Sequence, residues 1–396
     1  MTKPSLELAP ALHSLFAIIE PNDCKHPPLK QNMWPEIVKL AARHRVDGLV
    51  ARALAEGKIT PPDTIRSHFV TCARNQGLAA AKSAKALREI AEIFGLYSIP
   101  FILLKGLSLS ERYYVSWADR QSIDIDLMVD EAHLEKAESA LAEIGFVSES
   151  FANIPRRCRG LAHRLRSDIA LRRSADEMKI ELHFRLFTNS HLLPLSFADL
   201  MDWSEILSIG RANVRVLKPH AMLVYLVVHG AKHGWFRLKW LADLDRALPT
   251  ISDEELSQAN ALVHQHGIEK LYATSFALLQ AVKGPAANAM MPAGFYPHVD
   301  HHLLAQMTAM LQRDEVLESF RLQDVGNFID NCELDFALRD SWRYRFRSIE
   351  NLLFDIRDIE TLRLSARWRL FYWFFGPIAR IVRSFARTIL PALRSR

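Results

Sequence analysis

The sequence predicts an α+β fold that is mainly helical, with a small mixed sheet between helical regions. Apolar residues recur every three or four positions from Ser5 to about Ile99 and again from Pro219 onward, as they do along one face of an α-helix. Between these regions, three short segments have the apolar patterns of β-strands. The predicted regions are an N-terminal helical region (1–96), an α/β core (97–190), a helical domain (191–325) and a C-terminal helical region (326–396).

The first predicted strand is 101–104, a run of four apolar residues that leads into Lys105-Gly106. Such a run is typical of a buried strand that enters a turn. A helix is expected to follow at 107–114. The turn is therefore placed between a strand and the beginning of a helix.

The second predicted strand is 123–129, in which every other residue is apolar. Because successive side chains of a strand point to opposite faces, Asp124, Asp126 and Met128 share the other face. This alternation predicts a half-buried strand, and the helical period resumes at 131–144.

The third predicted strand is 178–187, with Glu181 and His183 on its polar face. Between the second and third strands lies an arginine-rich stretch, 156–173, which is expected to form a hairpin or a helix with a loop. It can receive an acidic ligand or remain a solvated basic loop, and no particular arginine is singled out.

The composition is that of a globular protein with room for more than one domain. The chain has 396 residues, of which 49% are hydrophobic and 24% charged, and this balance excludes a disordered or fibrous protein. Its four cysteines form no CxxC pair, so neither a zinc site nor a disulfide framework is expected, and a reducing cytoplasm fits best. The N-terminal residues do not have the pattern of a secretion signal.

The strand carboxylates are the strongest candidates for chemistry. Asp124 and Asp126 lie two residues apart on one strand face, with Cα atoms about 7 Å apart, which suits joint coordination of hard divalent cations. Glu181 can complete the cage from another strand. Three such carboxylates can hold two Mg²⁺ ions for in-line displacement at a phosphate. Taken alone, however, a DxD pattern is more often a solvated polar face.

The turn between the first strand and its helix favours phosphate binding. Gly106 lets the backbone approach closely, and Ser108 lies in the first turn of a helix whose N-terminus attracts anions. Lys105 follows four apolar residues, so it either reaches a bound phosphate or neutralises the carboxylates. Arg120 either holds a phosphate or pairs with Asp124.

These residues, taken together, resemble a known family. The resemblance is to the uncharacterised nucleotidyltransferases of the DNA polymerase beta-like superfamily, and it is good over about 100–250. It rests on Leu104-Lys105-Gly106, Arg120, Asp124-Ile125-Asp126-Leu127, Val129, Gly145-Phe146, Glu181-Leu182-His183-Phe184, His229, His233-Gly234-Trp235 and Trp240-Leu241-Ala242-Asp243.

The resemblance implies a polymerase beta-like mixed-sheet core beside a helical domain, with Mg²⁺ (two ions, with Mn²⁺ as a substitute) and a nucleoside triphosphate as substrate. Asp124, Asp126 and Glu181 would ligate the metal, with Glu181 as a possible base. The acceptor is a small molecule, sugar, peptide or protein. Phosphoryl transfer, hydrolysis or a non-catalytic nucleotide-binding regulatory module are the alternatives. The superfamily more usually has Gly-Ser where Lys105-Gly106 stands, so the phosphate contacts remain open.

Further candidates lie on the predicted helices and on the third strand. His229, Lys232 and His233 share one helix face and either line a nucleotide cleft or pack against other helices. Gly230 occupies the position where a zincin protease needs Glu, which argues against that class. Asp243 is spaced to form a surface pair with Lys239, and His183 can orient Glu181 or contact the substrate.

The basic tail, 363–396, holds eight arginines and no acidic residue. Its uncharged segment is only ten residues long, against the roughly 20 that a bilayer requires, so no transmembrane helix is expected. Its apolar stripe flanked by arginines is typical of a helix that packs on its own protein, or of one that contacts a membrane surface or a protein partner.

Overall fold

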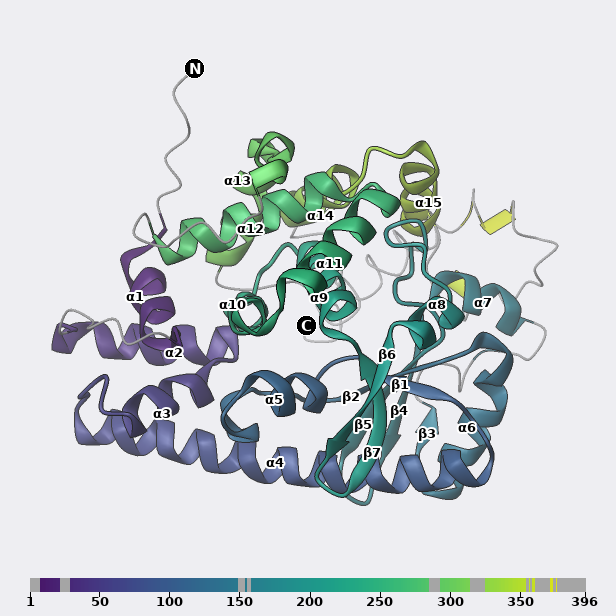
Figure 1. The fold of residues 1–396 in the computed structure, drawn as a ribbon, viewed down its shortest axis with the longest axis horizontal. Helices are drawn as coiled ribbons and strands as arrows, with labels where there is room; N and C mark the ends of the chain where they lie inside the picture. The colour runs from purple at the N-terminus through teal and green to yellow at the C-terminus, as the bar shows by residue number, and fades with distance from the viewer. Residues whose placement is uncertain are drawn as a thin grey trace, which may run out of the picture.

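The computed structural model describes residues 8–21, 29–148, 154, 158–284, 293–313 and 325–353, together with 356, 358–359, 371–372 and 375. Helices surround one seven-stranded mixed sheet (Figure 1). The predicted α+β class, mainly helical and with flanking helical regions, is confirmed. The arginines of the basic tail and the beginning of the arginine-rich stretch, 156–157, lie outside the described residues.

The N-terminal region is helical where it is described. Its helices are α1 (Pro10–Ile19), α2 (Trp34–His44), α3 (Asp47–Ala55) and α4 (Asp63–Leu96). Helix α4 begins directly after Pro62 and is 34 residues long. It extends from the N-terminal helices to the sheet (Figure 1). Phe69, near its beginning, belongs to one hydrophobic core, while Ile90 and Phe94, near its end, belong to the core beside the sheet.

The sheet combines parallel and antiparallel pairs. Its strands are β1 (Phe101–Leu103), β2 (Ile125–Val129), β3 (Val147–Ser148), β4 (Asp168–Arg173), β5 (Met178–His183), β6 (Ser204–Ile209) and β7 (Ala212–Leu217). Their order is β3-β4-β5-β2-β1-β7-β6. Strands β2 and β5 are parallel, as are β1 and β7, and the other neighbours are antiparallel. The three predicted strands are present, although β5 ends at His183 rather than at residue 187.

The sequence did not predict β3, β6 or β7, and β4 lies in the arginine-rich stretch for which a hairpin was one expectation. The hairpin of β6 and β7 lies beyond residue 190, where the sequence predicts a helical domain. In the structure it extends the sheet beyond β1, with β7 next to β1 and β6 at the edge. Strand β7 has the alternation of a strand, since Ala212, Val214 and Val216 are buried. The turn at Gly210, which has a φ of 58°, is the other signal of this hairpin.

Strand β2 is buried on both faces, so the prediction of a half-buried strand was wrong. Leu127 belongs to the core that the sheet forms with α4 and with α6 (Leu134–Glu143). Met128, on the other face, belongs to a second core that includes α9 (Pro219–Lys232). A helix that packs over the polar face cannot be inferred from the strand alone.

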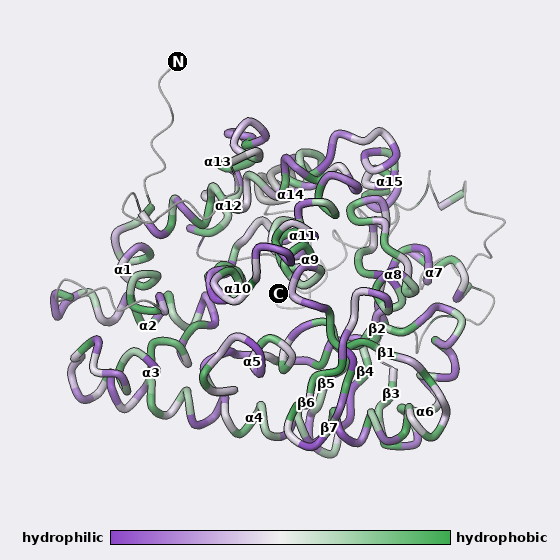
Figure 2. The backbone as a smooth tube through the Cα atoms, in the orientation of Figure 1, coloured by the Kyte–Doolittle hydropathy of each residue, from purple (hydrophilic) through white to green (hydrophobic). Residues whose placement is uncertain are grey.

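Most of the remaining helices form the upper part of the molecule in Figure 1, whereas α5 lies in its lower part, next to α4. Helix α9 is buried on nearly all sides, and Figure 2 shows apolar residues along it and in the neighbouring strands. Within the described ranges, no helix combines the length and apolarity that a membrane span requires. The other helices are α5 (Leu107–Tyr113), α7 (Arg159–Leu165), α8 (Phe197–Asp202), α10 (Leu238–Ala247), α11 (Asp253–His266), α12 (Glu269–Lys283), α13 (His301–Gln312), α14 (Val325–Ala337) and α15 (Trp342–Leu353).

A buried histidine joins the N-terminal helices to α10. The Nδ1 atom of His44, at the end of α2, accepts a hydrogen bond of 3.1 Å from the backbone N–H of Leu238, the first residue of α10. Burial, together with the neighbouring Arg43 and Arg237, lowers the pKa of His44 to about 3. His44 is therefore neutral in the folded protein at every pH above this value.

This histidine should make the folded protein sensitive to acid. An unfolded histidine takes up a proton near pH 6.5, so the stabilisation is fully present above that pH and is lost as the pH falls toward 3. Between pH 6.5 and 5 the free energy of unfolding should fall by about 2 kcal/mol through His44. Urea unfolding measured at several pH values in this range gives the free energy of unfolding as a function of pH. Its slope against pH should be shallower for His44→Asn, whereas His302→Asn, at an exposed position of α13, should keep the wild-type slope. Equal slopes for all three proteins would contradict this role of His44.

Candidate active site

A cavity of about 600 Å³ opens between the sheet and helices α9, α10 and α14. Most of the residues singled out in the sequence line it, although they come from segments far apart in the chain. These residues are Lys105, Arg120, Asp124, Asp126, Glu181, His183, His229, Lys232 and His233.

The parallel pairing of β2 and β5 brings the carboxylates together. Asp126 stands opposite Glu181 in the register, and His183 follows two residues later on the same face of β5. His183 Nε2 lies 3.4 Å from Asp126 Oδ1 and 3.5 Å from Glu181 Oε2. Potential ligand atoms of these three residues all lie within 4.8 Å of one another. Asp124, which precedes β2, lines the same cavity but does not belong to this group.

Lys105 contacts the carboxylates directly. The backbone of Leu104 is fixed to β2, because its N–H donates a 3.0 Å hydrogen bond to the carbonyl of Asp126. This places the Lys105 ammonium in an ion pair with the Asp126 carboxylate. Two roles were predicted for Lys105, and the structure shows the second of them, neutralisation of the carboxylates.

The charges of the site are strongly coupled. Burial disfavours the charge of Asp126, but Lys105 and His183 hold the pKa of its carboxyl well below the usual range. Burial and the nearby Asp126 raise the pKa of Asp124. For His183, the carboxylates of Asp126 and Glu181 outweigh burial and raise the pKa to about 9. A buried carboxylate thus faces two cations at neutral pH.

The donor set fits a divalent cation. Asp126 is fully buried, and its Oδ2 atom accepts no hydrogen bond from any described residue. Buried carboxylate oxygens normally have a partner, so this oxygen points to a ligand. Glu181, whose side chain is 39% exposed, offers a second carboxylate beside it. Two carboxylates suit Mg²⁺ or Mn²⁺, with the remaining positions filled by water or phosphate oxygens.

Arg120 and Asp243 form a buried pair that was not predicted. Arg120 Nε lies 2.6 Å from Asp243 Oδ1, and its Nη2 lies 2.9 Å from Oδ2, a bidentate geometry. The hydroxyl of Tyr114 donates a 2.6 Å hydrogen bond to the same carboxylate. Of the two roles considered for Arg120, pairing with Asp124 is therefore wrong, and so is the expected surface pair of Asp243 with Lys239. The reason is that α10 packs against the segment around residues 114–120, which buries Asp243.

The helix histidines belong to an aromatic cluster in the cavity wall. The rings of His229 and His233 are 4.8 Å apart, and each lies about 5 Å from Trp240, at 5.4 and 5.1 Å. Burial lowers the pKa of both histidines well below the usual value. Lys232 lies over the ring of Phe187 at 5.5 Å. Both predicted settings are therefore present, because these side chains pack between helices and also line the cavity.

Gly106 and Ser108, unlike Lys105, are not part of the cavity lining. Gly106 has a φ of 79°, and a Cβ there would come within 3.0 Å of Ser122 Oγ. Glycine is therefore required where α5 begins beside the segment that leads to Asp124. Ser108 is buried, and the structure does not bring it to the cavity.

Several cations of the cavity were not singled out from the sequence. Lys239 lies beside Trp240, and burial together with Arg120 lowers the pKa of its ammonium to about 7. Its position directly before the Trp240–Asp243 run was a usable signal. Arg45 and Arg237 come from turns between elements, where no pattern marked them, and Arg166 lies in the arginine-rich stretch from which no particular arginine was singled out.

The mixed sheet directs acidic residues into a cation-lined cleft, an arrangement that suits the transfer of phosphorus-containing groups. The family model described as uncharacterised nucleotidyltransferase matches residues 30–284. The protein is therefore an enzyme that belongs to this family of nucleotidyltransferases, as the resemblance implied. The matched segment contains all the site residues discussed above. No curated protein matches the chain.

Proposed function

We propose that the protein is a Mg²⁺-dependent nucleotidyltransferase that transfers a nucleoside monophosphate from a nucleoside triphosphate to a hydroxyl group of an acceptor. The observation that carries this proposal is the unpartnered Asp126 Oδ2, which lies beside Glu181 in a cleft rich in cations. The acceptor is a small molecule, a sugar, a peptide or a protein.

Asp126 and Glu181 would hold the metal, with Asp124 at the entrance to β2 as a further carboxylate, and Mn²⁺ suits the same donors. When bound, such a cation polarises the attacking hydroxyl and stabilises charge on the phosphates. Without a bound cation, the ion pair with Lys105 partly offsets the negative charge of the carboxylates. If a cation neutralised Asp126, the Lys105 ammonium would be available to pair with a phosphate oxygen.

The opposite wall of the cleft would bind the triphosphate. Lys232 and Lys239 face the sheet from α9 and α10, and Arg237 and Arg166 lie in the same lining. Cations in a partly buried cleft attract a polyanion strongly because solvent screens them less than it screens surface charges. Trp240 and Phe236 add an apolar surface against which a nucleobase can stack.

Glu181 is the residue that we assign as the general base. Its carboxylate is the exposed member of the group, so an acceptor hydroxyl can reach it, whereas Asp126 is fully buried. The acceptor oxygen then forms a bond to the α-phosphorus, and the bond between the α- and β-phosphates breaks. Pyrophosphate leaves, and Glu181 holds the proton of the hydroxyl.

Isotope labelling tests this assignment. The protein is incubated with Mg²⁺ and each nucleoside triphosphate, labelled at the α- or the γ-phosphate, against a panel of hydroxyl-bearing acceptors. We expect the α-label in the modified acceptor, the γ-label in pyrophosphate, and no transfer in EDTA. Transfer of the γ-label to the acceptor would instead establish phosphoryl transfer, and release of label to water would establish hydrolysis.

We also propose that the reaction takes place in the cytoplasm. The described cysteines Cys72 and Cys332 form no disulfide, which fits a reducing compartment.

A further inference from the structure

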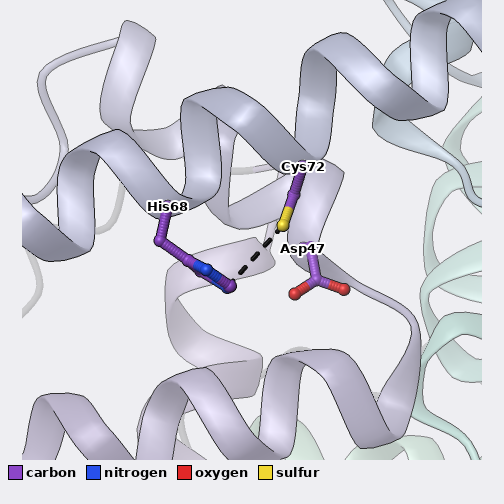
Figure 3. A group of neighbouring side chains, drawn as sticks. All are labelled: Asp47, His68 and Cys72. Carbon is purple, nitrogen blue, oxygen red and sulfur yellow. Dashed lines mark hydrogen bonds between the residues drawn. The ribbon is translucent and has the colours of Figure 1, made fainter.

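A second group of possible metal ligands lies far along the chain from the carboxylates of β2 and β5. Asp47 is the first residue of α3, and His68 and Cys72 lie on α4 (Figure 3). Because His68 and Cys72 are four residues apart in a helix, their side chains lie on the same face. Nitrogen, sulfur and oxygen atoms of the three side chains lie within 4.8 Å of one another.

The spacing of these atoms fits a tetrahedral zinc ion. His68 Nε2 lies 3.6 Å from Cys72 Sγ. With Zn–S near 2.3 Å and Zn–N near 2.05 Å, two ligands at the tetrahedral angle are about 3.5 Å apart. The two α4 side chains therefore already stand at the separation that zinc requires.

Asp47 supplies an independent observation. Asp47 is only 6% exposed, and its Oδ1 atom has no hydrogen-bond partner among the described residues. A buried carboxylate without a partner is costly unless a cation is bound. Figure 3 shows this carboxylate beside the His68 and Cys72 side chains. The carboxylate that carries the unpaired oxygen thus lies where a shared ion would contact it.

We propose that Asp47, His68 and Cys72 bind one Zn²⁺ ion, with the fourth position open to water. Nitrogen, sulfur and carboxylate oxygen are the ligands that zinc uses in proteins, whereas Mg²⁺ does not take thiolate. Cys72 has no CxxC partner, which is why the sequence does not predict this site. The proposal does not depend on the function assigned to the cleft.

The ion would join two helices that support the loop before Asp124. Helices α3 and α4 both pack on the short segment Trp117–Asp119, and Arg52 of α3 pairs with Asp119 at 3.2 Å. Burial raises the pKa of the Cys72 thiol, with Asp47 acting in the same direction. Zinc binding must therefore release the thiol proton.

Cobalt substitution tests the site in the full-length protein. Co²⁺ bound to a thiolate gives a strong near-ultraviolet charge-transfer band, and the cleft group of Asp126, Glu181 and His183 contains no sulfur. We expect one equivalent of Co²⁺ to produce this band and one equivalent of Zn²⁺ to abolish it. The band should be absent in Cys72→Ser and unchanged in Cys332→Ser, a matched loss of a thiol on α14. It should also persist in Asp126→Asn.

Affinity gives a second measurement. Loss of supporting residues around a metal commonly weakens binding by about 10- to 100-fold, so loss of the Asp47 ligand in Asp47→Asn should weaken Zn²⁺ binding by at least about tenfold. Circular dichroism establishes that each variant is folded. The proposal is wrong if the folded wild-type protein shows no cobalt–thiolate band, or if Cys72→Ser retains it.

Discussion

Replacing Asp126 by Asn should reduce the rate of nucleotide transfer by at least about 1,000-fold, which corresponds to about 4 kcal/mol of transition-state stabilisation. Asn has nearly the same shape but lacks the charge, so it leaves Lys105 and His183 without their shared anion. A divalent cation would then meet two positive charges in place of a carboxylate. Initial rates of α-label transfer at saturating Mg²⁺ measure the effect.

Asp130→Asn is a matched control for this variant. Asp130 directly follows β2, and its Oδ1 accepts a 2.8 Å hydrogen bond from the N–H of Ala132 at the exposed beginning of the next helical segment. Asn performs the same capping role, so activity should remain near that of the wild type. A folded Asp126→Asn protein that keeps more than a tenth of the activity would refute the assignment of Asp126 to the metal.

The Arg120–Asp243 pair should dominate the stability of the junction between the core and α10. Asp243→Asn leaves the buried Arg120 guanidinium without a counter-charge, and such a change typically costs about 3–5 kcal/mol. Urea unfolding, followed by intrinsic fluorescence, measures the loss. The exposed pair of Arg88 and Glu92 on α4 is the comparison, because Glu92→Gln should change the free energy of unfolding by less than about 1 kcal/mol.

A combined variant separates the two sources of this loss. If an unpaired charge is the cause, removing both charges and the hydroxyl that depends on them should restore most of the stability. The variant is Arg120→Met with Asp243→Leu and Tyr114→Phe. If it is no more stable than Asp243→Asn alone, the effect comes from packing at this junction and not from the buried charge.

The local elements could be predicted because their causes are local. The alternation at 125–129 and 178–183 identified two strands, and the apolar run before Lys105 identified the third. The position of Asp126 opposite Glu181 could not be predicted from the strand patterns alone, because the register of two parallel strands depends on the whole sheet. The sequence identified both residues as polar members of strands but not their distance.

Long-range pairs could not be predicted in this way. Arg120 and Asp243 are separated by 123 positions, and their pairing follows from how α10 packs on the core. The i,i+4 rule instead favoured Lys239 as the partner, since it considers one helix in isolation. The same limitation applies to the proposed zinc site, where the spacing of His68 and Cys72 is visible in the sequence but the approach of Asp47 from α3 is not.

Helix α4 makes the N-terminal region inseparable from the catalytic part of the chain. Its last three turns supply one wall of the core beside the sheet, through Ala86, Leu87, Ile90 and Phe94. A fragment that begins at residue 97 would uncover this apolar wall to water and invite aggregation. The smallest active fragment must therefore begin before α4. That requirement agrees with the start of the family match at residue 30, and it makes the long helix a shared component of both regions.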